Sequence, residues 1–348
     1  MQQSEFKYLP WHESAWRQLS APAAGLPHAL LLTGPEGIGK GLFARALAAR
    51  LLCETSGGDL ACGSCPSCRW LASGNHPDIR HIVPEADAES DDSPNDTDRK
   101  KASKQILIDQ IRALEEFIYV GGHRNGARVV VIEPAEAMNV SAGNSLLKIL
   151  EEPPSSVYFI LISSQWRRLL PTIRSRCQTL NLPRPSIAEA REWLDHQGKQ
   201  IAPELLPLLG DAPLLALEEI ERGRGSILTG LLGTLADPGR DPLALAARWQ
   251  NQLQLKSDAG VPMENFIRLV QKWVFDLALG KLAARSRFGA RGVEKARDLT
   301  AKASSAGLIR CYNDLMKFRA LASHPLNPQL FLEDVAERYL RALAAERP

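Results

Sequence analysis

The chain has 348 residues, of which 45% are hydrophobic and 24% charged, so we expect a globular protein of two or three domains. A protein that binds nucleic acid alone usually has a strong excess of basic residues, and the net charge here is only +2. The aromatic content of 6% also makes a platform for base stacking an unfavourable interpretation.

The longest apolar runs, such as "HALLLTG" and "VYFILIS", are too short to span a bilayer. The N-terminal segment "MQQSEFKYLPWHES" has no apolar core of the kind found in signal peptides. We therefore expect a cytoplasmic protein with no membrane partner.

The first half of the chain reads as an α/β domain, expected over residues 1–184. Strand-like apolar runs occur at 30–33, 79–83, 129–132, 157–163 and 179–182, with helical patterns between them. Strands that alternate with helices predict a mostly parallel sheet flanked by helices.

Residues 34–41, "GPEGIGKG", follow the first strand-like run and precede a helical pattern, which is the context of a phosphate-binding P-loop. The backbone amides of this loop could hold an anion at the start of the helix. The candidate residues are Gly34, Gly37, Gly39 and Lys40. The next position, which normally supplies a hydroxyl ligand to magnesium, is Gly41, so the loop is degenerate.

Four of the six cysteines form a C-x8-C-x2-C-x2-C cluster: Cys53, Cys62, Cys65 and Cys68. Four closely spaced thiolates favour tetrahedral zinc in a structural site. Disulfides are disfavoured in a reducing cytosol, whereas an iron–sulfur cluster or a redox role stays open. The nearby His76 and His81 are interpreted as ordinary residues, and Cys177 and Cys311 as packed core thiols.

Residues 85–104 hold seven acids followed by four bases, without apolar periodicity. We interpret this segment as a solvated, mobile surface insertion, with a partner-binding segment as the alternative.

The run 129–132 ends in Glu133-Pro134, where an active P-loop ATPase of this kind carries Asp-Glu. Glu133 could replace the magnesium ligand, but Pro134 has no group that polarises water. The register of Glu136 is doubtful for catalysis. With Gly41, two catalytic positions are lost, so we expect no hydrolysis, while nucleotide binding stays open.

Two further stretches are distinctive, "NSLLKILEEPP" (144–154) and "LLPTIRSRC" (169–177). The first predicts a short helix that Pro153 and Pro154 stop, with four apolar residues on its buried side: Leu146, Leu147, Ile149 and Leu150. The second places Arg174 and Arg176 after a strand and a proline turn, from which a guanidinium can project.

From residue 187 onward the pattern is helical, without a convincing strand. The segment "LPRPS" suggests a linker into a small helical domain over residues 185–225. A larger helical domain is expected over residues 226–348, and the boundary near 225 is soft.

These motifs resemble the AAA+ clamp-loader family of bacterial DNA polymerase III. The resemblance rests on "NSLLKILEEPP", on Ser175-Arg176-Cys177, on the four-cysteine insertion and on "GNHPDI" beyond it, and covers about residues 20–183. It implies an AAA+ domain, a helical lid and a collar domain for oligomerisation.

In this family the Ser-Arg-Cys arginine is a finger that reaches the ATP site of a neighbouring subunit, which assigns that role to Arg176. Some members keep the finger although their own ATP site is degenerate. The segment 209–223 has no arginine at the start of its helix to sense a γ-phosphate, and Arg222 comes too late. The four cysteines match the zinc ligands of the family.

The resemblance therefore implies a non-hydrolysing clamp-loader subunit, not an enzyme in isolation. Its implied partners are the tau and gamma ATPase subunits and the delta subunit, with the sliding clamp and primer–template DNA reached through the complex. The alternatives are an active P-loop ATPase resembling tau and gamma, and a small-molecule P-loop kinase or redox protein that carries zinc.

Overall fold

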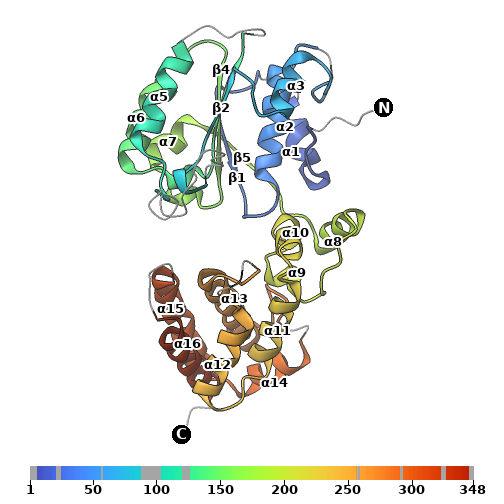
Figure 1. Cartoon of the computed structure of the whole chain (residues 1–348), viewed down its shortest axis with the longest axis vertical. Helices are drawn as coiled ribbons and strands as arrows, with labels where there is room; N and C mark the ends of the chain where they lie inside the picture. The colour runs from blue at the N-terminus through green and yellow to red at the C-terminus, as the bar shows by residue number, and fades with distance from the viewer. Residues whose placement is uncertain are drawn as a thin grey trace. The chain divides into compact units, whose positions relative to one another are not determined.

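The protein is described by a computed structural model (Figure 1), which covers residues 6–20, 25–55, 58–87, 103–119, 126–255, 257, 259–290, 293–322 and 327–344. The chain divides into two compact units, Met1–Arg184 and Pro185–Pro348. The three-domain division, with its boundary near 225 inside the second unit, stays a prediction.

The first unit is built on a five-stranded sheet in the order β2-β3-β4-β1-β5, in which every neighbouring pair is parallel. The strands are β1 (Ala29–Thr33), β2 (Ile79–Ile82), β3 (Arg128–Ile132), β4 (Val157–Ser163) and β5 (Gln178–Asn181). All five predicted strands and the parallel α/β class are confirmed, with bounds that differ from the sequence estimate by a residue at most ends. The central strands are almost wholly buried, which explains why they read as continuous apolar runs.

Helices cover both faces of this sheet. They are α1 (Glu13–Ser20), α2 (Lys40–Leu52), α3 (Pro66–Ala72), α5 (Ile108–Tyr119), α6 (Val140–Glu151) and α7 (Pro171–Arg176). Short 3-10 helices are η1 (Pro10–His12), η3 (Glu85–Asp87), η4 (Ala135–Ala137) and η5 (Trp166–Arg168). Figure 1 shows α5, α6 and α7 on one side of the sheet and α1, α2 and α3 on the other.

Alternate residues of each strand enter the two cores on either side of the sheet. Leu31 and Phe159 pack with α5 and α6, whereas Leu30, Leu32 and Ile160 pack with α1 and α2. This follows from the two-residue period of a strand, which sends successive side chains to opposite faces.

The helix predicted within 144–154 is α6, which begins earlier than the motif. Asn139 caps it by accepting a hydrogen bond from the Ala142 backbone amide at 2.8 Å, and the helix ends before the two prolines. Leu147, predicted on the buried side, is partly buried and packs against the same core as the other three apolar residues of the motif.

The described part of the second unit is entirely helical. Its helices are α8 (Ile187–His196), α9 (Leu205–Leu208), α10 (Pro213–Glu221), α11 (Gly225–Ala236), α12 (Pro242–Leu253), α13 (Met263–Ala283), α14 (Glu294–Lys302), α15 (Ser305–Leu321) and α16 (Pro328–Leu343). The "LPRPS" segment leads into α8 through a capping box, in which Ser186 and Glu189 bond each other's backbone amides.

The larger core of this unit contains a buried hydrogen-bonded chain. Tyr339 donates its hydroxyl hydrogen to the Leu235 carbonyl at 2.6 Å and accepts from Trp273 Nε1 at 2.8 Å. Both aromatic side chains are fully buried. The chain satisfies polar groups that burial would otherwise leave unpaired, and it joins α11, α13 and α16.

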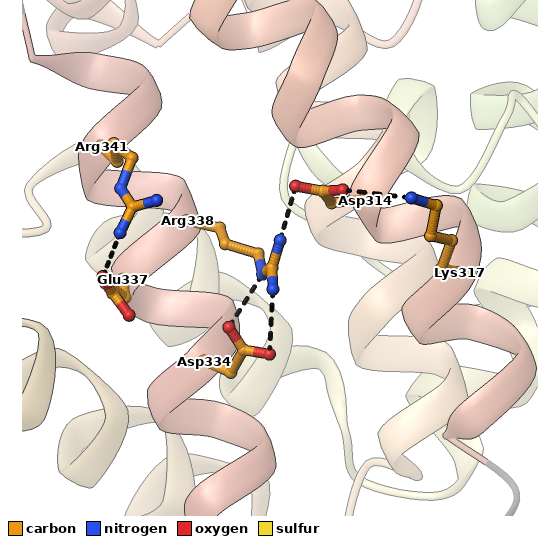
Figure 2. A network of polar contacts seen from close by, with 6 residues as sticks. All are labelled: Asp314, Lys317, Asp334, Glu337, Arg338 and Arg341. Carbon is orange, nitrogen blue, oxygen red and sulfur yellow. Dashed lines mark hydrogen bonds and ion pairs between the residues drawn. The ribbon is translucent and has the colours of Figure 1, made fainter.

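A surface network joins α15 and α16 (Figure 2). Arg338 of α16 bonds Asp334 on its own helix and Asp314 on α15, each at 2.8 Å, and Lys317 lies 3.8 Å from Asp314. The hydrogen bonds that Arg338 donates to both aspartates raise the pKa of Arg338. Because the ion pair of Arg338 with Asp314 lies at the surface, we expect it to stabilise the packing of α15 on α16 by no more than about 1 kcal/mol.

Two sequence expectations fall partly outside this description. Most of the acidic insertion at 85–104 lies outside the described residues, apart from η3 and the first residues before α5. None of the described helices is long and apolar enough to cross a membrane.

Candidate functional site

The P-loop connects β1 to α2, at the carboxyl ends of the parallel strands, where ligands of α/β sheets bind. Gly39 caps α2 in the left-handed conformation, with φ +93°, and Gly37 has φ +75°. At Gly34 a Cβ atom would lie 3.0 Å from the Leu182 carbonyl oxygen. The loop therefore has the backbone shape that the glycine pattern predicts.

Lys40 begins α2 and is only 6% exposed. Its Nζ donates to the Pro35 carbonyl at 2.6 Å and to Ser164 Oγ at 2.8 Å. Burial lowers the pKa of Lys40, and the carboxylates of Glu133 and Glu136 act in the opposite direction. A phosphate at this loop would compete with the two oxygen partners that the ammonium already has.

Glu133 directly follows β3 and lies against the start of α2. A Cβ atom on Gly41 would be 3.1 Å from Glu133 Oε2, so this carboxylate fills the space beside the missing hydroxyl side chain. Burial raises the pKa of Glu133, and Lys40 lowers it. His81 Nε2 lies 3.8 Å from the same oxygen, and because burial lowers the pKa of His81 we expect a neutral imidazole there.

Glu136 lies in η4 and is occupied by the backbone of a neighbouring loop. Its Oε1 accepts from the amides of Ser164 and Gln165, both at 3.0 Å. Pro134 precedes η4 as its N-cap residue and offers no polar side chain. The carboxylate of Glu136 therefore anchors the segment that follows β4.

Ser164 and His12 were not among the residues indicated by the sequence. Ser164 follows β4, which pairs with β1, so the rule that carboxyl ends of parallel strands meet could have placed it near the P-loop. His12 is fully buried between Trp11 and Phe43, with ring centroids 5.8 and 5.7 Å away. Burial and the charge of Lys40 lower the pKa of His12 to about 4.

The four clustered cysteines come together at the far end of α2. Cys53 is the C-cap of α2, Cys65 is the N-cap of α3, and Cys68 lies in the first turn of α3. Their sulfur atoms lie within 4.8 Å of one another, with 4.0 Å between Cys53 and Cys65 and 3.9 Å between Cys62 and Cys68.

These distances fit one tetrahedral metal better than disulfides. A zinc ion with Zn–S bonds of about 2.3 Å places its sulfur ligands about 3.8 Å apart. A disulfide requires sulfur atoms about 2.05 Å apart. The four thiols can therefore hold a metal ion such as zinc, which would leave no open position for a substrate.

Backbone amides surround the sulfur atoms and favour thiolates. Cys62 Sγ accepts from the amides of Ser64 at 3.4 Å and Cys65 at 3.3 Å, and these bonds lower the pKa of Cys62 to about 5. Burial raises the pKa of Cys53 and of Cys68. A bound metal would deprotonate those two thiols as well.

His76 supports this region without joining the cysteine group. Its Nδ1 accepts from the Asp78 amide at 3.0 Å, so Nε2 carries the hydrogen and donates to Ser67 Oγ at 2.7 Å. Ser67 in turn donates to the Leu52 carbonyl at 2.6 Å. Ser67 thus ties α3 to the end of α2, and the buried imidazole ties α3 to the segment before β2.

Arg174 and Arg176 lie in the six-residue helix α7, which begins at Pro171. Arg176 Nη2 lies 2.5 Å from Glu151 Oε1, and its Nη1 donates to the Thr172 carbonyl at 3.2 Å. Arg174 instead lies over the Trp166 ring, 5.2 Å from its centroid. The two neighbouring arginines therefore have different partners.

Arg176 lies toward the opposite edge of the sheet from its own P-loop. It precedes β5, whose first residue, Gln178, pairs with Leu30 near the start of β1, whereas the P-loop begins after Thr33. The part of β1 between Leu30 and Thr33 is about 10 Å long. Arg176 lies beyond one end of this part and the P-loop lies beyond the other. The sheet thus separates the arginine from the P-loop of the same chain.

The parallel sheet and the glycine loop between β1 and α2 define a protein of the P-loop α/β class. Residues 12–186 match the family model described as "DNA polymerase III, delta subunit", and the chain belongs to this family. That region contains the P-loop, the four cysteines and Arg176.

Individual relatives carry the name of one subunit. The chain is 43% identical over 211 residues to DNA polymerase III subunit delta' of Pseudomonas aeruginosa, which covers 60% of each chain. It is 32% identical over 193 residues to the delta' subunit of Escherichia coli, over 55% of this chain and 53% of the relative. The matches span about two thirds or less of the length of these relatives.

More distant similarity extends to other polymerase III subunits. The chain is 32% identical over 240 residues to subunit tau of Salmonella typhimurium, over 63% of this chain and 35% of the relative. A solved gamma subunit-related protein of Thermotoga maritima aligns with 17% identity and a TM-score of 0.44, over 95% of this chain and 99% of the other.

Proposed function

We propose that the chain is a delta-prime type subunit of a bacterial DNA polymerase III clamp loader, which does not hydrolyse ATP itself and supplies Arg176 to a neighbouring ATPase. Membership of the polymerase III delta family and the delta' names of its relatives support the clamp-loader role. The observation that carries the finger role is the position of Arg176, toward the sheet edge away from its own P-loop.

The chemistry of its own P-loop supports the absence of hydrolysis. Gly41 offers no hydroxyl for magnesium, and the carboxylate of Glu133 lies in the adjoining space. Pro134 offers no group to orient water, and Glu136 is bonded to two backbone amides. Lys40 and the loop amides remain the only phosphate-binding elements of the motif, so nucleotide binding without turnover is compatible with the site.

The proposed partners are the tau and gamma ATPase subunits and the delta subunit, with the sliding clamp and primer–template DNA reached through the assembly. Residues 185–225 would form the lid and residues 226–348 the collar. Zinc bound by the four cysteines would be structural, because it would join α2 to α3 without an open coordination position. A cytoplasmic location stays a prediction.

ATP turnover tests this function. It is measured for the isolated chain, for the assembly with tau or gamma and delta, and for assemblies that carry Arg176→Ala or, as a matched control on the same helix, Arg174→Ala. The site that receives Arg176 should lose turnover by a factor on the order of 10³ when the finger is removed. Arg174→Ala should leave turnover close to that of the unchanged assembly.

Two results would contradict the proposal. Robust turnover by the isolated chain would favour an active ATPase that resembles tau and gamma. Normal hydrolysis and clamp loading by the Arg176→Ala assembly would remove the finger assignment.

A further inference from the structure

The finger candidate Arg176 is the last residue of α7, which packs closely against α6. A Cβ atom on Gly143 of α6 would lie only 2.9 Å from Leu170 Cδ1, and Ile173 of α7 is 1% exposed. Because little space separates the two helices, their packing fixes the position of the end of α6 relative to the end of α7. Glu151, the last residue of α6, thereby lies beside Arg176.

The guanidinium plane of Arg176 is held from two sides. Nη2 donates to Glu151 Oε1 at 2.5 Å, and Nη1 donates to the Thr172 carbonyl at 3.2 Å. Two hydrogen bonds from different nitrogens fix both the direction and the rotation of the planar group. A free arginine side chain would retain most of its rotamer freedom, which it would lose on docking.

The contact is specific to one acid and one arginine. Glu152, the next residue along the chain, has no ion pair among the residues that the structure describes, and Arg174 lies over Trp166. Nothing in the local sequence distinguishes Glu151 from Glu152 as the partner of Arg176. The geometry alone selects the pair.

The pair leaves the finger able to bind phosphate. A guanidinium has five N–H donors, and the two contacts occupy two of them. Arg176 is 35% exposed at its side chain, so the remaining donors are accessible. A carboxylate that holds one corner of the group is therefore compatible with donation to a second anion.

We infer that Glu151 is a positioning residue for Arg176, which holds the finger in the direction that a neighbouring ATP site requires. This inference rests on the proposed function, because it concerns the same arginine. Glu151 acts through Arg176 and needs no contact with the nucleotide. Loss of this preorganisation should slow the step that the finger accelerates by about 3- to 10-fold.

The test uses the complete assembly with its partner ATPase subunits. The variants are Glu151→Gln, Glu151→Asp, Arg176→Ala and the double variant Glu151→Gln/Arg176→Ala, with Glu152→Gln as the matched control. The readouts are kcat and KM for ATP, and the thermal midpoint of the free chain as a check on folding. Glu151→Gln should lower kcat at the receiving site about 3- to 10-fold with KM little changed, because a finger acts mainly in the transition state.

Glu151→Asp, which keeps the charge, should recover part of the loss, and Glu152→Gln should behave like the unchanged chain. In the Arg176→Ala background, Glu151→Gln should have no further effect, because coupled residues are not additive. An equal loss in both backgrounds, or an unchanged or higher kcat for Glu151→Gln, would overturn the inference while leaving the finger intact. An Arg176→Ala assembly with full turnover would instead overturn the proposed function, and the inference with it.

Discussion

The carboxylate of Glu133 lies where a side chain on Gly41 would extend, since a Cβ atom at residue 41 would be 3.1 Å from Oε2 and 3.4 Å from Oε1. An active P-loop ATPase has a hydroxyl residue at the position of Gly41 and an aspartate at the position of Glu133. This chain has no side chain at residue 41 and has a longer side chain at residue 133. The two departures are complementary in space, so a side chain restored at residue 41 alone should conflict with Glu133.

Replacement of Gly41 by threonine tests this relationship. We expect Gly41→Thr to lower the free energy of unfolding by about 1–2 kcal/mol when Glu133 is present, because the added atoms overpack the space. With Glu133→Asp the same substitution should cost little or nothing. Urea denaturation of the two single variants and the double variant measures the coupling, and the same cost in both backgrounds would refute it. None of the three variants should hydrolyse ATP, because Pro134 is unchanged.

The cysteine cluster gives a prediction about metal content. The purified chain should contain about one equivalent of zinc, and Cys65→Ser should lower both the zinc content and the thermal midpoint, because the ligand set is broken. Cys177→Ser is the control, since Cys177 is a buried thiol outside the cluster, and it should leave the zinc content unchanged. Elemental analysis and thermal melts with and without chelator measure both. A folded, metal-free protein whose midpoint ignores chelator would exclude a structural metal.

The sequence predicted those features that local patterns encode. The buried central strands β1, β3 and β4 produced continuous apolar runs, and β2 and β5 produced shorter strand-like patterns. The P-loop glycines and the cysteine spacing follow from local backbone geometry. The helix α7 was not predicted, because its six residues, which begin with Pro171, are too few to show helical periodicity.

Partners from distant segments could not be predicted in this way. The bond between Lys40 and Ser164, and the pair of Glu151 with Arg176, join residues far apart in the sequence. His12 gave no signal, because a single histidine in "LPWHES" belongs to no motif, although the side chain is fully buried. Only the tertiary packing of α1 and η1 against α2 places it near Lys40.

Protonation of His12 predicts a pH dependence of stability. Its pKa of about 4 in the folded protein lies below the ordinary value of 6.5, because burial and Lys40 disfavour the charged form. The unfolded chain therefore takes up the proton first as the pH falls. The stabilisation is complete above pH 6.5 and is lost between about pH 6.5 and pH 4, with a maximum near 3 kcal/mol.

The variant His12→Phe keeps the aromatic packing and removes the titration. Between pH 7 and pH 4, the unfolding free energy of this variant should fall by about 3 kcal/mol less than that of the unchanged chain. Denaturant titrations across this range decide the point, and parallel profiles for His12→Phe and the unchanged chain would rule out a neutral, buried His12.

The buried hydroxyl of Tyr339 predicts a large effect of a single oxygen atom on the stability of the second unit. Tyr339→Phe leaves the buried Trp273 Nε1 without its acceptor and the Leu235 carbonyl without its donor. Because a buried polar group that loses its partner costs about 1–3 kcal/mol, we expect a loss of about 2 kcal/mol or more. Tyr312 is the matched control, a half-buried tyrosine on α15 whose ring packs against Phe275, and Tyr312→Phe should change stability by less than about 0.5 kcal/mol. Urea denaturation measures both variants, and equal small losses would show that the buried chain does not stabilise the helical unit.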